Sequence, residues 1–149
     1  MYERILVPVD GSSTSKRGLD EALQIAARLG SRIRIVHVVD DASLAMATSA
    51  LATNVGDLLV SLADAGAGIL DEAQRVAQAS GVTVDTALRH NTAGRVSDVI
   101  IKEAADWPSD LIVIGTHGRR GAGRWLLGSD AEQVLRSAPV PVLLVRAAG

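Results

Sequence analysis

The sequence predicts an α/β protein with an open, five-stranded parallel sheet and helices on both of its faces. Three observations predict it: five short apolar runs, helical patterns between them, and a run at 111–114 with no polar residue. Strands without polar residues are typically buried on both faces. Strands that alternate with helices form right-handed crossovers and therefore a parallel sheet. A chain of this length is most simply one domain, over 1–149.

The first strand is expected at 5–9, with Pro8 near its end, where a missing amide proton is tolerated. The turn that follows is rich in helix-capping residues, and the helix after it should stop at Gly30. Asp10 falls just past the carboxyl end of the strand, the usual place for ligand contacts in an open α/β sheet. It is also a common turn or capping residue, so both interpretations stay open.

The second strand is expected at 33–39, with His37 as a packed strand residue. Alanine- and serine-rich sequence follows as a loop or loose helix, and a helix then runs over 57–80. Gly66 and Gly68 weaken that helix, and close packing on the sheet is the favoured explanation for both.

The third strand, at 82–88, alternates apolar with polar or small residues, so one of its faces should be less buried. Thr92 is a candidate cap for the next helix. Pro108 forces a break after that helix, and Trp107 is expected to cover the edge of the core. The apolar face of the helix consists of Val96, Val99, Ile100 and Ala104.

The fourth strand ends in a glycine-rich loop, 115–128, that contains five glycines, three arginines and no acidic residue. Ser129 should open the last helix as its cap, with Glu132 at capping-box spacing. Glycines let a backbone approach a ligand, and a helix N-terminus offers unpaired amides and a partial positive charge. The loop therefore indicates a phosphate site, although a surface loop with solvated arginines fits the same pattern.

Composition excludes several classes of function. The chain has no cysteine, so disulfides, thiolate metal sites and a cysteine nucleophile are excluded. Aromatic residues make up 2% of the chain and the formal net charge is −2, which argues against nucleic-acid binding. We find no secretory signal and no apolar run of the about 20 residues that a membrane span needs. A cytoplasmic protein without membrane insertion is the default expectation.

The loop spacing resembles a known signature. Gly115, two residues, Gly118, nine residues, Gly128 and Ser129 are similar to the G-x2-G-x9-G-S/T pattern of the nucleotide-binding branch of the universal stress protein family. The resemblance also includes the segments 4–12, 110–114 and 139–146. It covers the whole chain and is weakest between about Asp41 and Ser80.

The resemblance implies a Rossmann-like fold with strand order 3-2-1-4-5, as in the related adenine nucleotide alpha hydrolase-like proteins. The first and fourth strands then lie side by side at a reversal of strand order, where open α/β sheets bind ligands. The fifth strand, Val142–Val145, becomes an apolar edge, and exposed edges invite pairing with another chain. Similar proteins dimerise through this strand, so we expect a homodimer.

The resemblance also implies an adenine-nucleotide site, with ATP as the expected ligand. Asp10 would contact the nucleoside, and the backbone of Val38 or Val39 would contact adenine. Backbone amides of the glycine-rich loop and the last helix would hold the phosphates. His117 would be either a phosphate donor or a residue that fixes the turn. The predicted site consists of Pro8, Val9, Asp10, Val38, Val39, Ile114, Gly115, Thr116, His117, Gly118, Arg119, Gly128, Ser129, Asp130 and Ala131.

Asp130 departs from the family pattern, which usually has a small apolar residue after the Gly-Ser pair. A carboxylate there favours the helix dipole but would repel a triphosphate unless Mg²⁺ lay between them. We therefore expect ATP together with Mg²⁺.

The expected function is a nucleotide-binding stress-response protein that turns ATP over slowly or not at all, with an unidentified protein partner as a further expectation. We find no catalytic constellation, and the lysine of a P-loop is missing. One alternative is an ATPase or nucleotidyl-transfer enzyme of the same superfamily. Another is a dimeric interaction module without nucleotide. A response-regulator receiver is disfavoured because Asp10 stands without an acidic neighbour and His90 ends the third strand.

Overall fold

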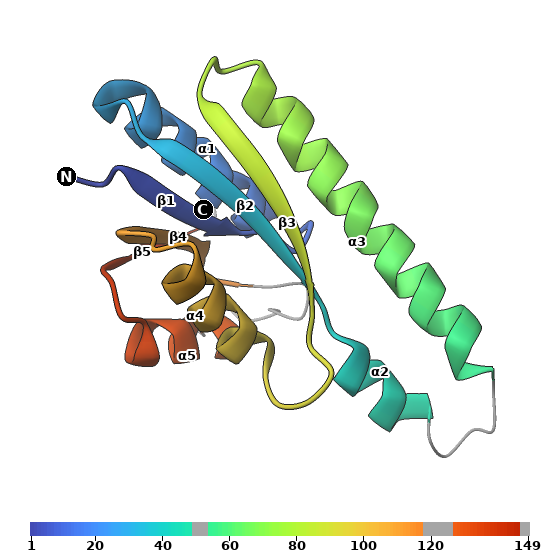
Figure 1. The fold of residues 1–149 in the computed structure, drawn as a ribbon. Coiled ribbons are helices and arrows are strands. Elements are labelled where there is room, and N and C mark those ends of the chain that lie inside the picture. The colour runs from blue at the N-terminus through green and yellow to red at the C-terminus, as the bar shows by residue number, and fades with distance from the viewer. Residues whose placement is uncertain (49–53, 118–126, 147–149) are drawn as a thin grey trace.

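Five parallel strands form one sheet in the order β3-β2-β1-β4-β5 (Figure 1). The computed structural model describes residues 1–48, 54–117 and 127–146. β1 lies beside β4, where the strand order reverses. This arrangement confirms the predicted fold class and strand order. The strands are β1 (Arg4–Pro8), β2 (Arg32–Val39), β3 (Thr83–His90), β4 (Leu111–Gly115) and β5 (Val142–Val145).

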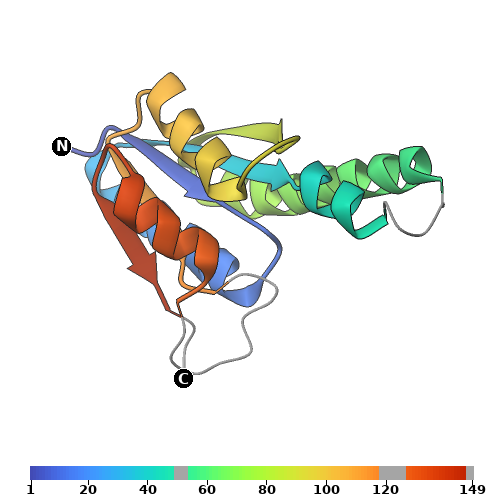
Figure 2. The ribbon, with the colours of Figure 1, turned by 90° about the horizontal axis from the view of Figure 1, so that it is seen from below.

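Helices cover both faces of the sheet (Figure 2). α1 and α3 pack on one face, and α4 and α5 pack on the other. Among the described residues, no helix is both long and apolar enough to cross a membrane. The helices are α1 (Ser13–Leu29), α2 (Asp41–Thr48), α3 (Val55–Gln78), α4 (Val96–Asp106) and α5 (Ser129–Ser137).

Alternate side chains of each central strand enter two different apolar clusters. In β1, Ile5 and Val7 pack with α1 and α3, whereas Leu6 between them packs with α4 and α5. All three side chains are fully buried. Because helices cover both faces, a central strand of this sheet needs apolar residues on both sides, which explains the unbroken apolar runs in the sequence.

The predicted loop or loose helix after β2 is helical in its first part, as α2. α3 then runs without a break through Gly66 and Gly68 and extends well past the end of the sheet (Figure 1). A Cβ on Gly66 would lie 2.8 Å from Cδ2 of His37, so glycine lets α3 approach β2. A Cβ on Gly68 would meet nothing within 4 Å. Close packing therefore explains the first glycine and not the second.

α4 begins later than predicted. Its cap position is Arg95, whose amide donates to Oδ2 of Asp98 at 3.3 Å, so Thr92 does not cap the helix. Trp107 follows the helix end and packs, partly buried, against the cluster of α4 and α5, as expected. The guanidinium carbon of Arg34 lies 4.9 Å from the centre of the Trp107 ring system, within cation–π range.

Charged side chains occupy the α4 side of the edge strand β3. Arg34 Nε lies 2.6 Å from Oδ1 of Asp85, and its Nη1 lies 3.0 Å from Oε1 of Glu103. Arg89 Nε lies 2.6 Å from Oε2 of Glu103, which is only 4% exposed. The hydrogen bond to Asp85 raises the pKa of Arg34 above its already high usual value. This half-exposed charged face matches the prediction that one side of the third strand is less buried.

Candidate functional site

A cavity of about 1100 Å³ opens at the carboxyl ends of β1, β2 and β4. This is the point where the strand order reverses, as expected for a ligand site in such a sheet. Gly118 and Arg119 of the predicted site lie outside the described residues, and Thr116 does not line the cavity. The predicted residues that do line it are Pro8, Val9, Asp10, Val38, Val39, Ile114, Gly115, His117, Gly128, Ser129, Asp130 and Ala131.

Asp10 has a structural role at the end of β1. Its Oδ1 accepts the amide of Ser12 at 2.9 Å, while the Ser12 side chain caps α1 by accepting the amide of Ser15 at 3.2 Å. The turn interpretation of Asp10 is therefore confirmed. A carboxylate has several acceptor positions, so the turn contact and a contact to a ligand in the cavity are compatible.

The end of β2 distinguishes between the two valines proposed for base binding. The Val39 carbonyl accepts the Asn91 amide at 2.8 Å and faces β3, whereas the Val36 carbonyl accepts the Val9 amide at 2.8 Å and faces β1. Peptide groups of alternate residues in a parallel strand face opposite neighbours. The peptide group of Val38 therefore faces the β1 side, as that of Val36 does. It lies beyond the Val36–Val9 hydrogen bond, towards the end of the sheet. Its amide and carbonyl point toward the cavity that Val38 lines.

His37 is a packed strand residue, as predicted. Its Nδ1 lies 2.7 Å from the carbonyl oxygen of Val9 and, because a carbonyl only accepts, Nδ1 carries the proton. The ring fills the space that Gly66 leaves open on α3.

Gly115 permits a close crossing between β4 and the first turn of α1. A Cβ at this position would lie 2.7 Å from the carbonyl carbon of Thr14 and 2.8 Å from the amide nitrogen of Ser15, both backbone atoms. The glycine is therefore required for packing, whether or not its backbone contacts a ligand. Real Cβ atoms do not come this close to a main chain that cannot move away.

The base of the glycine-rich loop is closed by hydrogen bonds within the chain. The Thr116 amide donates to the Val145 carbonyl at 2.9 Å, and the Gly128 amide donates to the Thr116 carbonyl at 2.6 Å. These two amides were predicted to hold phosphates, but both already have a protein partner. Their bonds extend the sheet past β4 and bring the loop ends together.

His117 has one of the two roles left open for it, because its backbone fixes the turn after β4. Its carbonyl accepts the hydroxyl of Thr14, and Ser12 Oγ lies 3.4 Å from the same oxygen, so its backbone is fixed to the start of α1. Nδ1 of its ring lies 2.9 Å from Thr116 Oγ1. Nε2 is buried and has no partner among the described residues.

The N-terminus of α5 brings backbone amides to the cavity. Gly128 is the cap residue and has no side-chain cap, so the predicted capping box of Ser129 and Glu132 is wrong. The Glu132 amide donates to the Gly128 carbonyl at 2.9 Å, which closes the first helical turn. The amides of residues 129–131 precede that bond and form the first turn of the helix, whose amides lie outside its i→i−4 ladder. Such a helix end attracts anions.

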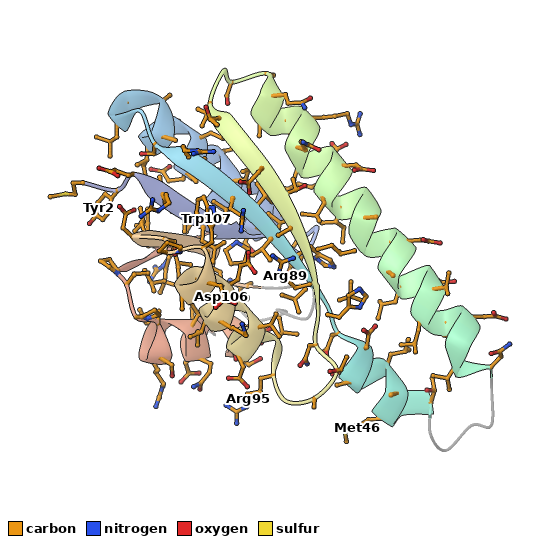
Figure 3. All side chains as sticks on the ribbon, in the orientation of Figure 1. Tyr2, Met46, Arg89, Arg95, Asp106 and Trp107 are labelled. Carbon is orange, nitrogen blue, oxygen red and sulfur yellow. The ribbon has the colours of Figure 1, made fainter. Side chains whose placement is uncertain are left out.

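Two arginines and a serine of the cavity wall were missed by the sequence analysis. Arg95 projects at the start of α4 (Figure 3), and its Nη1 lies 3.3 Å from Oε1 of Gln133 on α5. Arg136 lines the cavity from α5, and Ser97 lines it from the first turn of α4. The misplaced start of α4 concealed Arg95 and Ser97. Arg136 carried no sequence pattern that could have indicated it.

A histidine–carboxylate pair lies elsewhere. His90 Nδ1 is 2.6 Å from Oδ2 of Asp41, where the end of β3 meets the start of α2. Neither residue lines the cavity. Within the described part of the chain, no group of three or more His, Cys, Asp or Glu residues could hold a metal ion.

Comparisons with known proteins agree with this fold. A universal stress protein of Methanocaldococcus jannaschii is 31% identical over 147 residues, covering 98% of this chain and 83% of that protein. The structure of the universal stress protein UspA from Lactobacillus plantarum is 32% identical, with a TM-score of 0.79, and the match covers 97% of this chain and 98% of that one.

A second solved structure is a universal stress protein in complex with cAMP. It is 26% identical, with a TM-score of 0.69, and the match covers 99% of this chain and 98% of that one. The model of the "Universal stress protein family" matches residues 1–146. With a family match over nearly its full length and relatives that share its topology, this chain belongs to the universal stress protein family.

Proposed function

We propose that this protein binds an adenine nucleotide, with ATP as the preferred ligand, in the cavity at the ends of β1, β2 and β4. The observation that carries the proposal is that an apolar slot, the Val38 peptide group and the N-terminus of α5 all meet in one cavity. A nucleotide needs an apolar surface for the faces of its base, a donor and an acceptor for the polar edge of the base, and amide donors for its phosphates. The cavity volume, about 1100 Å³, is ample for such a ligand.

The base would lie in the apolar part of the cavity. Val36, Val38, Ile100 and Ile114 line this part, and all four are nearly or fully buried. The Val38 amide and carbonyl supply a donor and an acceptor side by side, and adenine presents an acceptor nitrogen beside an amino donor. Asp10, at the end of β1, would contact the ribose.

The phosphates would lie at the N-terminus of α5. The amides of Ser129, Asp130 and Ala131 are the donors, and the helix dipole adds a partial positive charge. Buried Nε2 of His117 is a further donor when it carries the proton. Asp130 brings a negative charge to the same place, so a Mg²⁺ ion belongs to the proposal. The Asp130 carboxylate would hold it, and its charge would offset the repulsion of the phosphates.

A relative supports the ligand class. The universal stress protein solved in complex with cAMP shares the fold over nearly the whole chain, and cAMP is an adenine nucleotide. The His90–Asp41 pair lies outside the cavity and offers no general base to a bound nucleotide. We therefore propose a regulatory stress-response role in which ATP is bound and turned over slowly or not at all, with readout through an unidentified protein partner.

Calorimetric titration of the full chain with ATP, AMP and cAMP, each with and without Mg²⁺, tests the proposal. We expect saturable binding of at least one adenine nucleotide, tightest for ATP with Mg²⁺. Absence of saturable binding by all three at millimolar concentration would overturn it. Steady ATP turnover that disappears in Asp10→Ala would favour the enzyme alternative.

A further inference from the structure

The Ser97 hydroxyl is a buried polar group without a partner. Ser97 is 0% exposed, and its Oγ has no hydrogen-bond partner among the described residues. It is the second residue of α4 and lines the cavity. A buried hydroxyl left unpaired costs about 1–3 kcal/mol. An alanine would fill the same space without that penalty.

Another serine near the opposite end of α4 shows the ordinary arrangement. Ser109 is 5% exposed, and its Oγ donates to the Ala104 carbonyl at 3.2 Å. Ser109 does not line the cavity. Of these two serines, the one that lines the cavity, Ser97, is therefore the one whose hydroxyl has no partner among the described residues. Asn91 Oδ1 is also buried and unpaired within the described chain, but Asn91 does not line the cavity.

The surroundings of Ser97 restrict what its hydroxyl can contact. Val36, Ile100 and Ile114 line the same part of the cavity, so a ligand there needs flat apolar faces. A hydroxyl both donates and accepts, and rotation about χ1 lets it reach a neighbouring group in three staggered positions. A planar heterocycle with a polar edge fits this combination.

We propose that the Ser97 hydroxyl recognises the exocyclic amine of the bound base by accepting a hydrogen bond from it. This inference rests on the proposed adenine-nucleotide site. In adenine, the amine and the glycosidic nitrogen lie at opposite ends of the purine. With the sugar near Asp10 and the phosphates at α5, the amine points away from both. Ser97, on α4, is the side chain that receives it.

The test compares two ligands and three proteins by calorimetry in the presence of Mg²⁺. The ligands are ATP and purine riboside 5′-triphosphate, which lacks only the amine. The proteins are the wild type, Ser97→Ala and the matched control Ser109→Ala. Thermal unfolding of each protein without ligand is measured alongside.

We expect Ser97→Ala to weaken ATP binding about three- to tenfold and to leave the binding of purine riboside triphosphate unchanged. Its melting temperature without ligand should be equal to or above that of the wild type, because an unpaired hydroxyl is removed. Ser109→Ala should melt lower and bind ATP normally. A purely structural serine would not give this opposite pair of effects.

Unchanged ATP affinity in Ser97→Ala would overturn the inference, as would equal losses for both ligands. If Ser97→Ala does not fold, the comparison of the two ligands on the wild type tests the inference. Equal affinity of the wild type for ATP and purine riboside triphosphate would overturn the inference. These results leave the proposed function standing. Failure of the wild type to bind any adenine nucleotide is a different outcome, which removes the proposed function and this inference with it.

Discussion

Single glycines determine how closely the helices of this protein approach the sheet. At Gly66 the ring of His37 and a methyl group of Val39 occupy the space that a Cβ would need. At Gly115 the obstacle is the backbone of α1, which cannot move aside. Gly68 faces open space, so nothing in the structure requires a glycine there. Two glycines on one helix thus differ in what a side chain would meet.

We predict opposite effects for alanine at the two glycines of α3. Gly68→Ala should raise the free energy of unfolding by about 0.5–1 kcal/mol, because alanine favours the helix and meets no neighbour. Gly66→Ala should lower it by about 1–2 kcal/mol, because its Cβ would lie 2.8 Å from the His37 ring. Urea unfolding measures both, and a stabilised Gly66→Ala would show that the ring moves aside freely.

The N-terminus of α5 is the element on which the proposed phosphate site depends. Two loop amides that were predicted to bind phosphates, those of Thr116 and Gly128, donate to carbonyl groups of the protein instead. The helix end remains, with three amides before its first turn closes. It lacks a side-chain cap, so a ligand would supply the acceptor that a cap usually provides.

We predict that Ser129→Pro weakens ATP binding at least about tenfold while α5 stays folded. Proline is tolerated at the first helical position and removes one amide donor, and a hydrogen bond to a charged group is worth about 1.5–3 kcal/mol. Gly128 has φ −58° and ψ 147°, which a following proline allows. Ser129→Ala, the control, keeps the amide and should lose less. Equal affinity of Ser129→Pro and wild type would exclude this helix end as the phosphate site.

The ion pairs between β2, β3 and α4 should contribute more to the free energy of unfolding than exposed surface ion pairs do. Glu103 is 4% exposed and pairs with Arg34 and Arg89, so Glu103→Gln should lower the free energy of unfolding by about 1–2 kcal/mol. The exposed pair of Glu132 and Arg136 is the control, and Glu132→Gln should change it by less than about 0.5 kcal/mol. Chemical denaturation compares them, and equal small effects would show that solvent screens both pairs.

At the scale of the whole molecule, the two edges of the sheet differ. β3 carries charged side chains on the α4 side, which discourages pairing with another strand. β5 consists of four apolar residues, and Leu143 is 36% exposed. An unshielded apolar edge of this kind favours a second copy of the chain as its neighbour, which is why we propose a homodimer through Val142–Val145.

We predict that the wild type is a dimer at micromolar concentration and that Leu143→Lys makes it monomeric, because a charge at the edge opposes strand pairing. Val60→Lys is the control, since Val60 is 61% exposed on α3. α3 lies beside β3, at the opposite edge of the sheet from β5 (Figure 1). Size-exclusion chromatography with light scattering measures the mass. A monomeric wild type would contradict the proposed interface.

The sequence by itself determined the sheet, most of its helices and the end of the sheet at which the candidate site lies. Unbroken apolar runs such as the one in β4 specify buried strands, because burial on both faces allows no polar residue. Asp10 and the start of α5 line the cavity, and the sequence indicated both because ligands in such folds meet the carboxyl ends of strands and helix N-termini. These properties depend on local pattern and chain order, which a sequence displays directly.

The tertiary structure alone decided which groups remain available in the cavity. Whether the Thr116 amide binds an anion or Val145 depends on β5, which lies far along the chain. The choice of Val38 over Val39 depends on where β1 ends relative to β2. The burial of Ser97 depends on the packing of α4 against the sheet. Hydrogen-bond partners distant in the sequence are set by packing, and no local pattern encodes them.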